Sequence, residues 1–311
     1  MNGLKVSPSP HLHDNISTQR VMLNVIIALL PACAAGIYIF GYMAAVNLAV
    51  CVVSCVLFEF LARRIMKRPQ TVSDLSAVVT GLLLGMNLPA TINPLYGVVG
   101  SFVAIVVTKQ LFGGLGQNFA NPAIVGRIVL MLSFTGQMTT WCQPFYYRSG
   151  ADIVTGATPL VSGNASYMEL FLGNVGGCIG ETSAAALIIG GIYLLCTHTI
   201  TIHAPAAFLG TVALLTFLTG GDVPYQLLSG GLMLGAFFMA TDYATTPITG
   251  RGKLIFGIGC GLLTFLIRNY GNYPEGVSFS ILLMNILTPY IDRLTEIRPL
   301  GGKFPEKEGR K

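Results

Sequence analysis

Ten apolar segments, separated by short polar turns, constrain the fold of this chain more than any other feature. They cover roughly residues 21–40, 42–61, 75–88, 94–108, 121–134, 182–196, 204–219, 227–241, 253–267 and 276–291. A helix needs about 20 apolar residues to cross the hydrocarbon core of a membrane, and several of these segments are shorter. Short apolar segments bounded by glycine and proline are typical of broken or tilted helices around a site near the middle of a membrane.

The composition also indicates a membrane protein. Only 10% of the 311 residues are charged, whereas about 25% is usual in soluble domains. The net charge of +5 does not indicate a nucleic-acid partner, because the basic residues lie in the predicted short loops and the tail. Residues 1–20 form a polar leader without a signal-peptide cleavage pattern, so we expect the first apolar segment to be retained. We therefore predict an all-α integral membrane protein with about ten transmembrane helices.

The basic residues predict how the chain is oriented. With a cytoplasmic amino terminus and alternating segments, fifteen of the eighteen lysines and arginines fall on the cytoplasmic side. Of the others, Arg148 and Arg268 fall outside, and Arg127 lies within a segment. Because cytoplasmic loops carry an excess of Lys and Arg, we predict that both termini are cytoplasmic and that residues 135–181 form an outer loop.

A short internal match suggests two related halves. The sequence GLLLG at 81–85 lies in the third segment, and GLMLG at 231–235 lies in the eighth, which is third in the second group of five. Two groups with an odd number of spans must insert with opposite topology, which is typical of inverted repeats. We predict five-helix repeats over 21–134 and 182–292, with a cytoplasmic leader 1–20, the outer loop 135–181 and a cytoplasmic tail 293–311.

Several other polar residues are expected to have no special role. The seven cysteines are scattered, without a C-x-x-C pair or a cluster with histidine, so neither an iron–sulfur nor another metal site is predicted. Glu59 and Glu181 lie at the ends of apolar segments and are expected to be interfacial.

The segment ADIVTGATPL at 151–160 is a polar island in the predicted outer loop. Pro159 disfavours a helical conformation at Thr158 and favours an extended one. Gly156 and Ala157 add little bulk, so we expect the Thr158 hydroxyl to be presented on open backbone. No base lies nearby in the sequence, so this arrangement suits a threonine modified by another enzyme better than a catalytic threonine. A simple turn is the alternative.

The same segment resembles a known flavin-attachment motif. Residues 152–158, DIVTGAT, are similar to the pattern D-x-x-[S/T]-G-A-T of the RnfD and NqrB families. The resemblance implies that the phosphate of FMN is esterified to Thr158 by a separate flavin transferase. It also implies that the transferase recognises Asp152, Thr155, Gly156 and Ala157. Thr155 stands where serine is common, and it keeps the hydroxyl.

The resemblance extends over roughly residues 15–300 and is closer to RnfD than to NqrB, which usually has a longer amino-terminal region. It includes NFANP at 118–122 and MATDY at 239–243. It implies a fold similar to that of urea channels and a second, noncovalent flavin, riboflavin, near the inner side. Asn121, Arg127 and Asp242 are the candidate residues for that second site. For Arg127, an arginine within an apolar run, snorkelling to the cytoplasmic face is the alternative to a buried functional or paired role.

Taken together, these features predict a membrane subunit of an Rnf-type complex in a prokaryotic cell (inner) membrane. The resemblance implies that it carries electrons through covalent FMN while the whole complex couples ferredoxin:NAD oxidoreduction to Na⁺ or H⁺ translocation. The implied partners are RnfA, RnfB, RnfC, RnfE and RnfG, with membrane lipid around the helices. The subunit alone is not expected to be a complete enzyme, because it has no nicotinamide fingerprint and no ferredoxin-type cysteines.

Two other classes fit parts of the pattern. A channel or secondary transporter of urea-channel-like architecture would also have ten spans in two inverted halves, and fold alone does not determine function. A flavin-vitamin uptake protein would bind riboflavin but would not need a tethering threonine. The TGAT sequence in the outer loop distinguishes the Rnf-type subunit from both.

Overall fold

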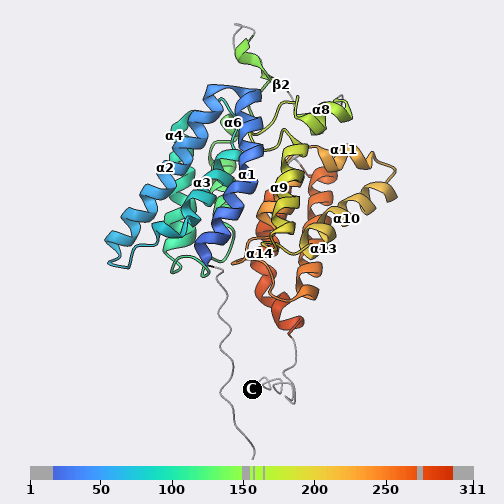
Figure 1. The fold of residues 1–311 in the computed structure, drawn as a ribbon. Helices are drawn as coiled ribbons and strands as arrows, with labels where there is room; N and C mark the ends of the chain where they lie inside the picture. The colour runs from blue at the N-terminus through green and yellow to red at the C-terminus, as the bar shows by residue number, and fades with distance from the viewer. Residues whose placement is uncertain (1–16, 149–154, 157, 164, 272–275, 297–311) are drawn as a thin grey trace, which may run out of the picture.

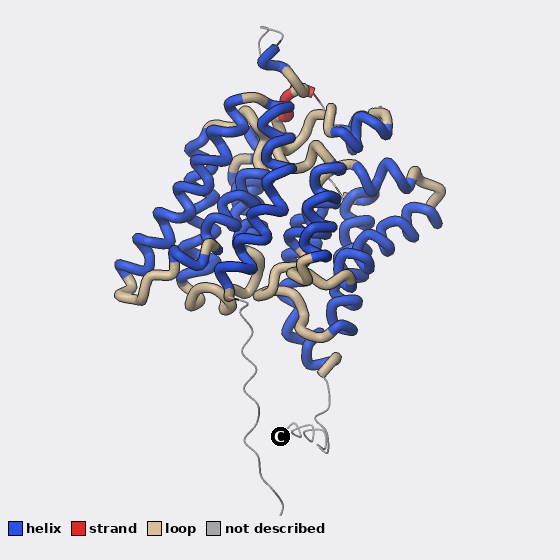
Figure 2. The backbone as a smooth tube through the Cα atoms, in the orientation of Figure 1, coloured by secondary structure: helices blue, strands red, loops and turns tan. Residues whose placement is uncertain are grey.

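A computed structural model describes residues 17–148, 155–156, 158–163, 165–271 and 276–296. These parts of the chain are almost entirely helical, and one pair of short strands lies at one end of the molecule, as Figure 2 shows. The prediction of an all-α architecture is confirmed in this coarse sense.

The first half of the chain contains five long or paired helices. They are α1 (Thr18–Phe40), α2 (Tyr42–Ile65), α3 (Ser76–Met86), α4 (Pro94–Phe102) continued by the π-helix η2 (Val103–Gln110), and α5 (Pro122–Ser133). A short 3-10 turn, η1 (Val72–Asp74), precedes α3. Both α4 and α5 begin with an Asn-Pro pair: Asn93 and Asn121 each accept a hydrogen bond from a backbone N–H of the first turn. Proline at the first helical position has no N–H to leave unsatisfied, so this pair is a strong start signal.

A polar segment joins the two halves. It contains α6 (Thr135–Met138), β1 (Trp141–Cys142), η3 (Tyr146–Arg148), β2 (Thr155–Gly156), α7 (Pro159–Ser162) and α8 (Tyr167–Leu172). β1 and β2 pair antiparallel, with Trp141 opposite Gly156.

The second half is also helical. Its elements are α9 (Ala184–Cys196), α10 (His203–Leu218), α11 (Val223–Leu228), α12 (Leu232–Leu234) continued by the π-helix η4 (Gly235–Met239), α13 (Gly250–Tyr270) and α14 (Val277–Leu294). Nine of the ten predicted apolar segments each overlap one helix or helix pair, whereas the segment 227–241 contains the end of α11, a non-helical turn, α12 and η4.

The helices differ in length as the segments predicted. Three of the described helices, α1, α2 and α13, are long and apolar enough to cross a membrane by length and composition. α13 begins at Gly250, three residues before the predicted segment, because Arg251 is polar and lies outside the apolar segment. In contrast, α3 has 11 residues and would rise only about 16 Å at 1.5 Å per residue.

Small residues bring the two halves together. α1 packs against α9, and α5 packs against α14. At the first contact the backbones are so close that a Cβ added to Gly190 would lie 2.1 Å from the Ala28 carbonyl oxygen. Such close approach of helices through glycine is common in membrane proteins.

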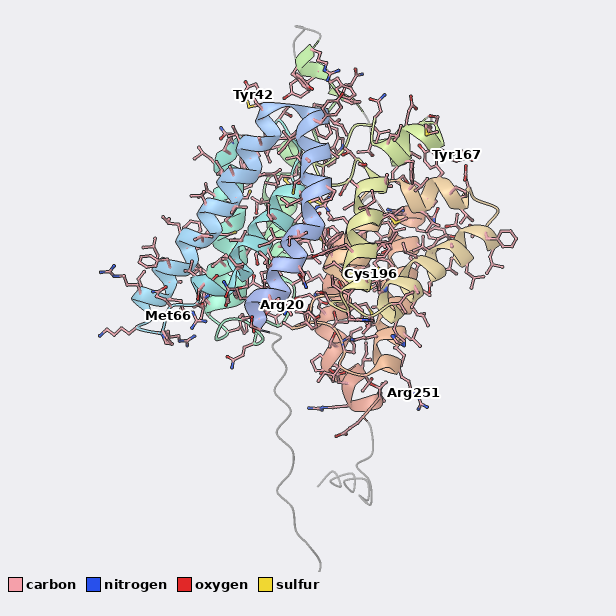
Figure 3. All side chains as sticks on the ribbon, in the orientation of Figure 1. Arg20, Tyr42, Met66, Tyr167, Cys196 and Arg251 are labelled. Atoms are coloured by element: carbon pink, nitrogen blue, oxygen red, sulfur yellow. The ribbon has the colours of Figure 1, made fainter. Side chains whose placement is uncertain are left out.

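The ends of the molecule differ in character. α1 begins and α14 ends at one end of the molecule, and β2 and α8 lie at the other, as Figure 1 shows. Figure 3 shows Arg20, Met66 and Arg251 at the first end and Tyr42 and Tyr167 at the opposite end. We call these the basic end and the loop end.

Candidate functional site

Thr158 lies at the loop end, immediately before α7. Its backbone is extended, with φ −64° and ψ 156°, and Pro159 is the first residue of the helix. The predicted effect of the proline on the preceding residue is therefore confirmed. Thr155 and Gly156 form strand β2, which ties this part of the motif to β1. Asp152 and Ala157 lie outside the described residues.

The Thr158 side chain differs from the prediction. We expected a hydroxyl presented to solvent, but the residue is only 3% exposed. Its Oγ1 has no hydrogen-bond partner among the described residues. A residue distant in the sequence fixes the position of this segment: the Tyr225 hydroxyl donates to the Pro159 carbonyl at 2.6 Å. A buried polar atom without a partner costs about 1–3 kcal/mol, so this hydroxyl is a candidate for a bond that the protein chain alone does not make.

A pocket near the basic end has a volume of about 690 Å³. Its lining includes Met22, Asp242, Tyr243, Thr288 and Asp292. Asp242 also lines a neighbouring cavity of about 240 Å³ and, together with Asn121, two smaller ones of about 50 Å³ each. Two of the three residues predicted for an inner site thus face the same group of cavities.

Local contacts fix both of these residues. The Thr245 hydroxyl donates to an Asp242 carboxylate oxygen at 3.1 Å. Burial raises the pKa of the Asp242 carboxyl above its ordinary value, and the hydrogen bond from Thr245 opposes that rise. Asn121 caps α5 through its side-chain oxygen and donates from Nδ2 to the Met239 carbonyl at 3.4 Å. The end of η4 and the start of α5 therefore meet at these cavities.

Arg127 is on α5 as well, but its guanidinium joins a different group of residues. It forms a 2.9 Å ion pair with Glu181 and donates to Asn87 Oδ1 at 2.5 Å and Ser278 Oγ at 3.1 Å. Arg127 is only 3% exposed, so the alternative of snorkelling to the membrane surface is wrong. The expectation that Glu181 is interfacial is also wrong, because the residue is buried beside this arginine.

A second buried ion pair was not predicted. Lys109, on η2, donates to both Glu59 oxygens, at 2.9 and 3.1 Å, and to Ser76 Oγ at 2.6 Å. Thr71 and Gln110 also donate to Glu59. Glu59 is fully buried instead of interfacial, and Lys109 is a buried cation instead of a loop charge. The available sequence signal was a glutamate within the apolar run of α2, which requires a buried partner.

The helix lengths, apolar surfaces and buried ion pairs define the class of this protein: it is a multi-span α-helical membrane protein. Comparison with known proteins then gives the family. Residues 5–301 match the NQR2, RnfD, RnfE family, and the chain belongs to that family.

Curated relatives match over nearly their whole length. The chain is 49% identical to the D subunit of the Na⁺-translocating ferredoxin:NAD⁺ oxidoreductase complex of Acetobacterium woodii, covering 99% of this chain and 98% of the relative. It is 42% identical to the D subunit of the proton-translocating ferredoxin:NAD⁺ oxidoreductase complex of Clostridium ljungdahlii, with 95% of each covered. It is 39% identical to the D subunit of the ion-translocating oxidoreductase complex of Stutzerimonas stutzeri, with 92% of each covered. The predicted resemblance to the RnfD family is confirmed.

Proposed function

We propose that this protein is the RnfD membrane component of an Rnf-type complex and carries FMN covalently on Thr158. The flavin would pass electrons across the membrane while the complex couples ferredoxin:NAD⁺ oxidoreduction to ion translocation. Relatives at 49% and 42% identity are named for different ions, Na⁺ and H⁺, so the proposal includes either ion. The observation that carries the flavin assignment is the buried Thr158 hydroxyl without a partner among the described residues, at the end of the sequence DIVTGAT.

The chemistry of attachment fits that hydroxyl. A flavin transferase would join Thr158 Oγ1 to the phosphorus of the FMN half of FAD; the pyrophosphate bond breaks, AMP leaves and the hydroxyl proton is released. Because Thr158 is buried under contacts from α11, attachment is expected before α7 packs into place. When bound, the flavin would supply one- and two-electron redox chemistry, and the protein would supply position and electrostatics.

We also propose that the cavities near the basic end accept a second, noncovalent flavin such as riboflavin. A volume of about 690 Å³ is within the usual range for small-molecule sites, about 300–1,000 Å³. Asp242 and Asn121 would supply acceptor and donor groups at its inner wall. Arg127, predicted for the same site, would act there only indirectly, through the position of α5.

The proposed arrangement has two inverted five-helix halves in a prokaryotic inner membrane. The contacts between α1 and α9 and between α5 and α14, the first and last helices of the two halves, support this arrangement. RnfA, RnfB, RnfC, RnfE and RnfG are the proposed partners, since the relatives are named as subunits of oxidoreductase complexes. A channel function remains the competing proposal, and it gives Thr158 no role.

The attachment is tested by the intact mass of the purified full chain, co-expressed with a flavin transferase. Wild type is expected to be heavier than its polypeptide by one FMN less water, and Thr158→Val is expected to lose that adduct completely. Thr155→Val is the matched control, because it removes a hydroxyl of the same motif that is not the proposed acceptor. A wild-type chain without the adduct, or an adduct that persists on Thr158→Val, would reject the proposal in favour of a channel.

A further inference from the structure

A corner of the second half holds the segment that follows Thr158. We call Tyr225, Ser229, Gly230 and Arg268 the outer corner. The Tyr225 hydroxyl bonds to the Pro159 carbonyl, one residue beyond Thr158, at 2.6 Å. The Ser229 backbone N–H in turn donates to the Tyr225 carbonyl at 3.0 Å. The attachment segment and Ser229 are therefore joined through a single residue of α11.

The same corner contains a second buried hydroxyl without a partner. Ser229 is fully buried, and its Oγ, like Thr158 Oγ1, has no hydrogen-bond partner among the described residues. Native proteins leave few buried polar atoms unsatisfied, and each one calls for an explanation. The two hydroxyls lie on segments from distant parts of the chain that contact each other through Tyr225 and Pro159 and through Gly230 and Leu160.

Arg268 makes the corner rigid and positive. Its guanidinium donates to the Ser229 carbonyl at 3.1 Å and to the Gln226 carbonyl at 2.8 Å, which fixes the turn after α11. That turn passes through Gly230, whose φ of +65° favours glycine. A Cβ added to Gly230 would lie 2.7 Å from Leu160 Cδ1 and 3.2 Å from Arg268 Nη2. Leu160, two residues beyond Thr158, thus packs directly against the turn that carries Ser229.

A phosphodiester is the group that suits these features. It carries negative charge, accepts hydrogen bonds from hydroxyl groups and is stabilised near a guanidinium. On Thr158 it would remove the unpartnered hydroxyl by esterification, and its free oxygens would accept a bond from Ser229. We propose that the Ser229 hydroxyl binds the phosphoryl group of the flavin on Thr158, with Arg268 as the positioning residue that holds the Ser229 turn. This inference rests on the proposed attachment of FMN to Thr158.

The test compares the full chain with and without attached flavin, produced with and without a co-expressed flavin transferase. Ser229→Ala removes only the hydroxyl, so the mass adduct is expected to remain and the flavin-free chain is expected to unfold at the same or a slightly higher temperature. With flavin attached, the increase in Tm that wild type shows is expected to fall by at least half. The fluorescence anisotropy of the tethered flavin is expected to fall as well, because its phosphoryl group is held less firmly.

Thr216→Val is the matched control. Thr216, on α10, also has a buried hydroxyl without a partner among the described residues, but it belongs to a different element. Thr216→Val is expected to keep both the Tm increase and the anisotropy of wild type.

The outcomes separate the two proposals. A wild-type chain without an adduct overturns the attachment itself. An adduct together with unchanged Tm increase and anisotropy in Ser229→Ala overturns only the role of Ser229. The role of Ser229 is also overturned if Thr216→Val behaves like Ser229→Ala. It is likewise overturned if Ser229→Ala loses the adduct, since Ser229 would then act in attachment and not in binding.

Discussion

At the scale of single residues, Arg127 shows how a buried charge can join distant parts of the chain. Its guanidinium has planar donors pointing in several directions. They reach Asn87 after α3, Glu181 before α9 and Ser278 on α14. The Cys178 thiol, also within 3.5 Å of Arg127, donates to the Asn87 carbonyl at 3.2 Å. The segments that follow α3 and precede α9 are held together at this point, where the Ile179 backbone N–H also donates to the Leu88 carbonyl at 3.1 Å.

We expect Arg127→Leu to destabilise the protein strongly, because it leaves the Glu181 carboxylate buried without its cation. Removing one partner of a buried pair typically costs about 3–5 kcal/mol. Arg127→Lys keeps the charge but offers fewer donors, so an intermediate loss is expected. Thermal unfolding of the detergent-purified variants measures both effects, and flavin content and electron transfer in the assembled complex should fall in the same order.

The double variant Arg127→Leu/Glu181→Leu is the control for this prediction. Replacing both charges removes the uncompensated carboxylate, so the double variant should be more stable than Arg127→Leu alone. If Arg127→Leu unfolds at the wild-type temperature, the pair is not important for stability.

Single residues also show which features the sequence could predict. The extended backbone of Thr158 follows from Pro159, its immediate neighbour, and the need of Arg127 for a partner follows from its apolar surroundings. The burial of Thr158 depends on Tyr225, which is 66 residues away from Pro159. The Glu59–Lys109 pair joins residues 50 apart. Such contacts depend on tertiary packing, for which a single sequence contains no periodic signal.

At the scale of helices, the motifs GLLLG at 81–85 and GLMLG at 231–235, which suggested a repeat, pack against different partners. In α3, a Cβ on Gly81 would lie 2.6 Å from the Val52 Cα, so this motif packs on the backbone of α2. In the second half, a Cβ on Gly231 would meet Glu181 instead, at 2.8 Å, and one on Gly235 would meet Val277 of α14. The two motifs therefore do not occupy equivalent packing positions, and the α1–α9 and α5–α14 contacts support the repeat better than they do.

Gly81 is nevertheless expected to be essential to the packing of α3 on α2. Gly81→Ala places a methyl group 2.6 Å from one backbone atom and 2.9 Å from another, and backbone atoms can move only with the whole helix. Overpacking of this kind typically costs about 1–3 kcal/mol. The measurement is the thermal unfolding temperature, which should fall by several degrees.

Gly210→Ala provides the matched substitution at a helix position with open space around it. An added Cβ there meets no atom within 4 Å, so Gly210→Ala should leave the unfolding temperature unchanged or raise it. Equal effects of the two substitutions would mean that the α2–α3 contact tolerates a wider separation than the structure has.

At the scale of the whole molecule, the arrangement of helices agrees with an even number of crossings. α1 begins and α14 ends at the basic end, and the attachment segment lies at the loop end (Figure 1). Lys109 is buried and no longer counts as a loop charge, but the prediction of the orientation does not change. The end of α2 still contributes Arg63 and Arg64, and the start of α13 contributes Arg251 and Lys253. The excess of basic residues on one side therefore predicts that the basic end is cytoplasmic.

The native cysteines allow this orientation to be tested with few changes. Cys196, the last residue of α9, is exposed, whereas the other six cysteines are buried. The predicted topology places this end of α9 on the cytoplasmic side. Cys142 lies near the loop end, but burial raises the pKa of its thiol to about 11. Since the thiolate is the reactive form, Cys142 should react little with a maleimide.

We expect a membrane-impermeant maleimide to label wild-type spheroplasts only after they are permeabilised, through Cys196. The variant Cys196→Ser/Tyr167→Cys moves the accessible thiol to an exposed position at the loop end, and it should be labelled in intact spheroplasts. Labelling in the opposite pattern would place Thr158 on the cytoplasmic side and would exclude an outer flavin.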